Sequence, residues 1–251
     1  MTEAEWLACR DPDRMLDYLG EAGVPSQRKL RLLAVSCCAR IVHLCPEPTV
    51  FRTTLETAEQ FADGGVPEQE MIDADGVLAI IERKLENNEG DEPDESDAAH
   101  SRYHAMQAVG QVLCLDTAEC PYFHRMRDVV LHVANAVAFE SIAGAGCETA
   151  KQKGLWERTE RAERGKLAGH VRDVFGNPFR PFTIAPAVRT TDVKLLARGI
   201  HLETAFDRMP ILADALQDAG CDNDEVLNHC RDATQVHVRG CWVIDLVLSK
   251  E

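Results

Sequence analysis

The sequence lacks the motifs that most often mark a nucleotide-binding or catalytic protein. None of G-x-x-x-x-G-K-[ST], G-x-G-x-x-G, G-x-S-x-G and H-E-x-x-H occurs in its 251 residues. Phosphate-binding loops, dinucleotide folds, hydrolase elbows and zincins therefore have no support in the sequence. These absences favour a protein without a catalytic centre, although they do not decide whether it is an enzyme.

Long apolar runs are also missing. No stretch reaches the roughly 18 uninterrupted apolar residues that a membrane-spanning helix needs. The first residues, "MTEAEWLACRDPDRML", have neither the positive start nor the apolar core of a secretory signal. We therefore expect a cytoplasmic protein that does not associate with membranes.

Positive charge is scarce relative to negative charge. The chain has 27 Lys and Arg against 42 Asp and Glu, a formal net charge of −15. Such a surface repels the phosphates of nucleic acids and anionic lipids, so nucleic acid is not an expected partner. A protein partner is compatible with this charge, and the oligomeric state is left open.

What the sequence does contain is a helical pattern. Aromatic residues make up only 6% of the chain, and the hydrophobic 45% is mostly Ala, Leu, Val and Ile at spacings of three and four residues. Thr2 and Glu5 have the spacing of a capping box, and Ser26 is placed to cap the helix that follows it. The fold class we predict is mainly α: a helical bundle with a C-terminal module of short helices and little or no sheet. Only "CWVIDLVL" fits a buried strand as well as a buried helix.

Two domains are expected, packed together as one unit. Residues 1–170 form a helical domain that contains an acidic loop at about 87–97, "NNEGDEPDESD", which has no apolar residue and should be solvated. Residues 171–251 form the short-helix module. The irregular stretch "GNPFRPFTIAPAV" follows the junction, and its three prolines rule out a continuous helix.

Segments at both ends of the chain resemble an uncharacterised protein family of planctomycete bacteria. The N-terminal segments are "MTEAEWLAC" and "RKLRLLAVSCC". The C-terminal ones are "FGNPFRPF", "AFDRMPILADALQDAGC" and "HVRGCWVIDL". This resemblance covers somewhat under half of the chain, and it implies a shared fold and cytoplasmic location but no activity.

The C-terminal part concentrates residues that bind metals. With no leader in front of them, the ten cysteines are expected to be reduced thiols, most of them small buried residues. Cys221, Cys230, His237 and Cys241 are candidate zinc ligands, and His229 can replace one of them. Their spacing contains only one tight pair, so buried thiols remain the favoured interpretation, and no cofactor is required.

The same stretch also allows a cysteine-dependent hydrolase or transferase. Cys241 would be the nucleophile at a helix N-terminus, His237 or His229 the base, and Asp245 the residue that orients the base. Against this, Trp242, Val243 and Ile244 indicate a buried segment, and burial raises the pKa of a thiol.

A second set of histidines lies in the middle of the chain. His100 and His104 are one helical turn apart, and His124, Asp128 and His132 form a stripe on the next predicted helix. A metal between two such helices is conceivable, but the Glu ligands of di-metal bundles are missing. We expect these histidines to be solvated.

The function we favour from the sequence is a non-enzymatic cytoplasmic module that binds another protein. The alternatives are a zinc-stabilised helical module and the cysteine-dependent enzyme. They are distinguished by whether the C-terminal Cys and His residues converge.

Overall fold

The protein divides into two compact units. In a computed structural model, which describes residues 1–23, 26–88, 96–114, 122–143 and 149–250, one unit comprises Met1–Cys9 together with Gly169–Glu251, and the other comprises Arg10–Ala168. The division expected from the sequence differs in placing residues 1–9 with the N-terminal domain. The predicted acidic loop lies largely outside the described residues, between a helix that ends at Asn88 and one that begins at Asp97.

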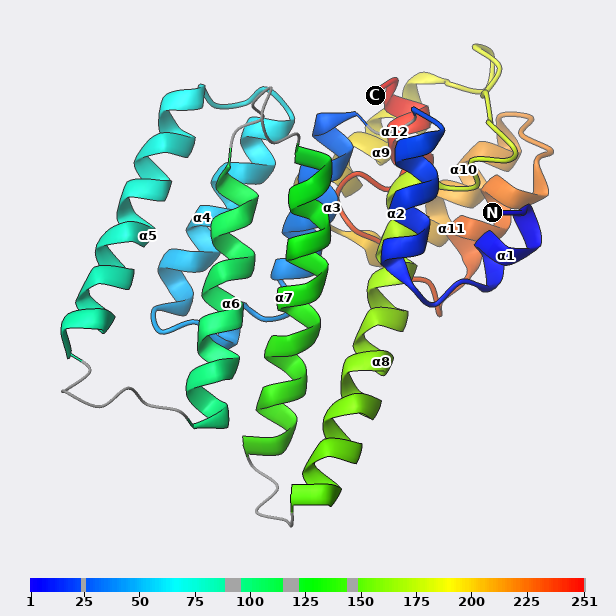
Figure 1. Ribbon diagram of the computed structural model, residues 1–251. Coiled ribbons are helices and arrows are strands. Elements are labelled where there is room, and N and C mark those ends of the chain that lie inside the picture. Colours follow the sequence, from blue (N-terminus) through cyan, green and yellow to red (C-terminus); the bar gives the residue numbers. More distant parts are fainter. Residues whose placement is uncertain (24–25, 89–95, 115–121, 144–148, 251) are drawn as a thin grey trace. The chain divides into compact units, whose positions relative to one another are not determined.

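The mainly-α prediction is confirmed. Every regular element in the described ranges is a helix, and no strand occurs in them (Figure 1). The ambiguous "CWVIDLVL" segment contains helix α12 (Trp242–Leu248). No helix among the described residues is long and apolar enough to cross a membrane.

The unit formed by residues 10–168 contains the longer helices. They are α2 (Pro12–Glu21), α3 (Gln27–Cys38), α4 (Pro48–Ala62), α5 (Glu68–Asn88), α6 (Asp97–Leu113), α7 (Tyr122–Ala143) and the greater part of α8 (Thr149–Phe175), with a 3-10 helix η1 (Val42–Leu44). Figure 1 shows α6 and α7 side by side, and the two are in extensive contact.

The α6–α7 contact has an apolar centre. Val109 and Val112 of α6 and Val130 and Val133 of α7 are fully buried, and their spacings of three place them on one face of each helix. Polar contacts also cross this interface, among them the Ser101 hydroxyl, which donates to the carbonyl of Ala136 over 2.8 Å.

The unit formed by residues 1–9 and 169–251 holds the candidate functional site. It contains α1 (Glu3–Ala8), the last turns of α8, α9 (Thr191–Glu203), η2 (Phe206–Arg208), α10 (Met209–Asp218), α11 (Asp224–Arg231) and α12. As predicted, Thr2 and Glu5 form a capping box at the start of α1. The core of this unit is built from α9, α10, α11 and α12 and includes Ile200, Leu212, Leu216 and Val243.

Candidate metal centre

Four metal-ligating side chains meet inside the unit formed by residues 1–9 and 169–251. They are Asp173, His229, His237 and Cys241, and one ligand atom from each lies within 4.8 Å of all the others. Oδ1 of Asp173 is 3.0 Å from Nδ1 of His237 and 3.2 Å from Nε2 of His229. Sγ of Cys241 is 3.2 Å from Nε2 of His229 and 3.9 Å from Nδ1 of His237.

Each ligand is held by a different part of the chain. Asp173 is in the last turn of α8, His229 is near the C-terminus of α11, His237 is in the loop after α11, and Cys241 is the N-cap of α12. The side chain of Asn223 caps α11 by accepting hydrogen bonds from the backbone N–H groups of Glu225 and Val226. The first residue of α11, and with it the position of His229 on the helix, is therefore set locally.

The turn before Cys241 depends on a glycine. Gly240 has a φ of +92°, which residues with a side chain rarely adopt. The loop is also tied to α8, because the backbone N–H of Val238 donates to Oδ2 of Asp173 over 2.8 Å. Asp173 therefore uses one oxygen to fix the loop and presents the other to both histidines.

The site is buried and carries negative charge. The side chains of Asp173, His237 and His229 are 0%, 7% and 11% exposed, and Cys241 is fully buried. Burial alone would raise the pKa of Asp173, but hydrogen bonds and charge interactions with His229 and His237 hold this pKa below its ordinary value. Burial, reinforced by the charge of Asp173, raises the pKa of the Cys241 thiol well above its usual range.

The orientation of the imidazoles shows what the group can do. Each histidine uses a single ring nitrogen to face both Asp173 and Cys241. This nitrogen is Nε2 in His229 and Nδ1 in His237. In a catalytic triad, the base faces the nucleophile with one nitrogen and its orienting acid with the other. Four ligand atoms gathered within 4.8 Å of one another are instead typical of a metal site, and this group could hold a metal ion.

The four histidine separations to Asp173 and Cys241 are compatible with tetrahedral coordination. With usual zinc bond lengths, a tetrahedron places two N or O ligands about 3.3 Å apart and an N and an S ligand about 3.6 Å apart. The N···O separations here are 3.0 and 3.2 Å. The N···S separations of 3.2 and 3.9 Å lie on either side of the expected value.

Surrounding groups support the ligands in the way that metal sites require. The backbone N–H groups of Val243 and Ile244 are hydrogen-bonded to the Cys241 thiol and lower its pKa, opposing the effect of burial. The Trp242 ring lies 5.1 Å from the His229 ring and 5.2 Å from the Phe182 ring, measured between centroids. The Trp242 ring thereby packs against His229 and restricts its orientation.

The structure brings together three of the five metal ligands proposed from the sequence. His229, His237 and Cys241 converge. Cys221 and Cys230 are 9% and 1% exposed and belong to the hydrophobic core of this unit. Burial raises the pKa of Cys230 to about 12, as suits a thiol that packs as a small apolar residue.

The carboxylate that contacts the two histidines is Asp173, which the spacing of residues in the sequence does not predict. Asp245, the orienting acid predicted for a cysteine-dependent enzyme, is buried in α12 and is not part of the group. Both histidines instead contact the carboxylate of Asp173, which lies 56 residues before His229 in the chain. The available signal was its setting, an acidic residue between Val171 and Val174 on the buried face of α8.

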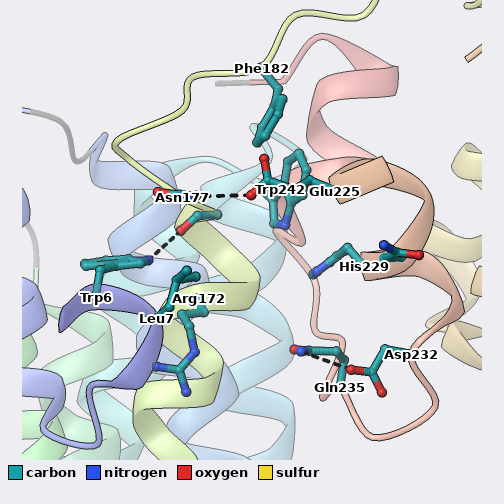
Figure 2. Close-up of a pocket in the computed structure, with 12 residues that line it drawn as sticks. Trp6, Leu7, Arg172, Asn177, Phe182, Glu225, His229, Asp232, Gln235 and Trp242 are labelled. Atoms are coloured by element: carbon teal, nitrogen blue, oxygen red, sulfur yellow. Dashed lines mark hydrogen bonds between the residues drawn. The ribbon is translucent and has the colours of Figure 1, made fainter. Parts of the chain in front are cut away.

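A pocket lies beside the group. It has a volume of about 280 Å³, and its walls include His229, Trp242, Phe182, Asn177 and Glu225 (Figure 2). His229 is the only one of the four ligands in its lining. Figure 2 shows Asp232 and Gln235, from the loop after His229, at another side of this pocket.

Comparison with protein-family models, with curated proteins and with solved structures found no match for this chain.

Proposed function

We propose that the unit formed by residues 1–9 and 169–251 is a zinc-stabilised helical module and that its zinc ion has a structural role. Asp173, His229, His237 and Cys241 would bind the ion. The observation that carries this proposal is that each imidazole directs one and the same nitrogen at both Asp173 and Cys241.

The donor set favours zinc among the common metals. One thiolate sulfur, two imidazole nitrogens and one carboxylate oxygen suit a tetrahedral Zn²⁺, whereas Ca²⁺ and Mg²⁺ prefer oxygen ligands only. Charge supports the same choice. With neutral imidazoles, the carboxylate of Asp173 and the thiolate of Cys241 cancel the two charges of the ion, so a neutral centre is buried rather than a charged one.

Four protein ligands favour a structural role over a catalytic one. Catalytic zinc sites usually have three protein ligands and leave one position for water or substrate. The ion would connect the end of α8, the end of α11, the following loop and the start of α12. Zinc binding would then contribute directly to the folding free energy of this unit.

The cysteine-dependent enzyme has less support. Cys241 is fully buried, and a buried thiol with a raised pKa has little thiolate with which to attack a substrate. Neither histidine has the two-sided contact that a base between a nucleophile and an acid needs. A binding role toward another protein stays a prediction.

Elemental analysis of untagged protein tests the proposal. We expect about one equivalent of zinc, lost in Cys241→Ala and Asp173→Asn. The matched controls are Cys221→Ala and Cys230→Ala, which remove thiols of the same unit outside the group and should keep the metal. Wild-type protein without stoichiometric metal, after purification without chelators and after incubation with Zn²⁺, would refute the proposal.

A second measurement covers variants that fail to fold. Replacement of the ion by Co²⁺ in the wild-type protein should give the visible absorption of a tetrahedral site with a thiolate-to-cobalt band. A spectrum without thiolate ligation would place the metal elsewhere in the chain.

A further inference from the structure

A second pair of histidines converges in the unit formed by residues 10–168. His104 is on α6 and His132 is on α7, the two helices that lie side by side in Figure 1. Their Nδ1 atoms are 2.8 Å apart, and their ring centroids are 5.1 Å apart. The expectation that the histidines of this region are solvated on exposed faces is thus wrong for this pair, whose side chains are partly buried and in contact.

The surroundings of the pair fix both rings. The His104 ring is stacked on Phe139 of α7 at 5.5 Å, and Tyr103 lies edge-on to His104 and His132. His100, one turn before His104, is also stacked on Phe139, with the ring centroids 5.0 Å apart. Two imidazoles held in place with facing nitrogens form a chelating arrangement that needs little further ordering.

We infer that His104 and His132 form a second metal site, for a divalent late transition metal such as Ni²⁺ or Cu²⁺. Neutral imidazole is a ligand that these metals favour. The site would provide two protein ligands, and water would complete the coordination because both side chains are only partly buried.

The nitrogens of this pair, 2.8 Å apart, are closer together than the N···O pairs of the proposed zinc centre, which are 3.0 and 3.2 Å apart. At metal–nitrogen bonds of about 2.0–2.1 Å, ligands at a right angle are about 2.8–3.0 Å apart, and tetrahedral ligands are about 3.3 Å apart. The observed 2.8 Å corresponds to neighbouring positions of a square-planar or octahedral ion. These are geometries of Cu²⁺ and Ni²⁺ rather than of structural Zn²⁺.

The charge state of the pair agrees with metal binding near neutral pH. Burial, with the charges of His132 and His100, lowers the pKa of His104 to about 4. Burial also lowers the pKa of His132, against the opposing effect of Asp128. Both rings are therefore mainly neutral at pH 7, so metal binding requires only that the proton of the Nδ1–H···Nδ1 contact moves to Nε2 of its own ring. The Asp128 carboxylate nearby favours a bound cation.

Without a metal, the contact between His104 and His132 is an N–H···N hydrogen bond. The experiment must therefore distinguish a metal-binding pair from a pair that is only hydrogen-bonded. Ni²⁺ is the suitable probe because Cu²⁺ oxidises thiols. It is titrated calorimetrically into the full-length protein whose zinc centre has first been saturated with Zn²⁺. We expect one Ni²⁺ per chain, bound at least ten-fold more tightly than by His104→Gln or His132→Gln.

His43→Gln is the matched control, since it removes an exposed imidazole of the same unit that pairs with Glu140, and it should leave the Ni²⁺ affinity unchanged. Wild-type affinity no higher than that of the two variants would overturn the inference and leave a hydrogen-bonded pair. Tighter binding of Zn²⁺ than of Ni²⁺ to the zinc-saturated protein would contradict the proposed geometry. If a variant unfolds, NMR spectra of the wild-type protein decide the question. Ni²⁺ bound by the pair should perturb the ring signals of His104 and His132, and this perturbation should disappear when acid protonates the rings.

Discussion

The indole Nε1 of Trp6 donates a hydrogen bond to the carbonyl oxygen of Gly176 over 3.1 Å, although the two residues are 170 positions apart in the chain. Trp6 is the only buried residue of the six-residue helix α1, so this contact explains why the first nine residues belong with the C-terminal unit. A second bond reinforces it, from Arg172 to the carbonyl of Cys9 at 2.8 Å.

Replacing Trp6 should therefore destabilise the C-terminal helices. We expect Trp6→Ala to cost about 3–5 kcal/mol, the range for loss of a large buried ring. Trp6→Phe should cost less, roughly 1–3 kcal/mol, because most of the packing remains while the Gly176 carbonyl loses its donor. Hydrogen exchange in peptides from α8 and α12 measures both effects. Unchanged protection there, with α1 alone exchanging faster, would contradict the expected coupling.

Gly176 should tolerate no side chain. Its φ is +66°, and a Cβ at this position would lie 3.1 Å from ring atoms of Trp242. Gly176→Ala combines a left-handed backbone, at about 1–2 kcal/mol, with displacement of the ring that packs on His229. We expect lower thermal stability and weaker zinc retention. Gly169→Ala is the control, because nothing lies within 4 Å of its Cβ and Ala favours a helix interior by up to about 1 kcal/mol.

The helices were predictable from local sequence, and the sites were not. Spacing of apolar residues and the caps at Thr2 and Ser26 are properties of neighbouring residues, and both caps are confirmed. The metal group, in contrast, needs Asp173 from α8 next to three residues of the 229–241 segment. Nothing in the local pattern around Asp173 determines which helix end it meets.

The histidines of the middle region show the same limit. Their spacing within each helix was evident, but whether His104 faces His132 depends on the rotation of α6 against α7. That rotation is set by the packing of residues such as Val109 and Val133. The side chain of His124, the other histidine of the predicted stripe, lies outside the described residues.

The pair between Arg40 and Glu163 predicts a pH dependence in the unit formed by residues 10–168. Glu163 is almost fully buried and accepts hydrogen bonds from Arg40 and Lys166. Burial would raise the pKa of Glu163, but these two cations lower it below its ordinary value of 4.5. Because the folded pKa lies below the unfolded one, the stabilisation is complete above about pH 4.5 and is lost as the pH falls through the folded value.

Glu163→Gln tests this dependence. The variant should be less stable at pH 7 by roughly 3 kcal/mol, the low end of the range for breaking a buried pair, since Arg40 is 29% exposed. The difference from wild type should shrink below pH 4.5, as measured by urea denaturation at several pH values. Glu160→Gln, on the same helix and 24% exposed, is the control with a smaller effect. A difference that stays constant down to pH 3 would contradict the assignment.

Thiol labelling distinguishes the zinc module from both alternatives. In native, metal-loaded protein, Cys221, Cys230 and Cys241 are all buried and should react slowly with iodoacetamide. A chelator should then expose Cys241 ahead of the other two, because only its sulfur is held by the ion and the 229–241 segment loosens when the ion leaves. A catalytic thiol would label first without any chelator, since its thiolate fraction would be raised. Three plain core thiols would respond to denaturant but not to the chelator. Mass spectrometry of the labelled peptides assigns the order, and Zn²⁺ added back after chelation should restore the protection of Cys241 alone.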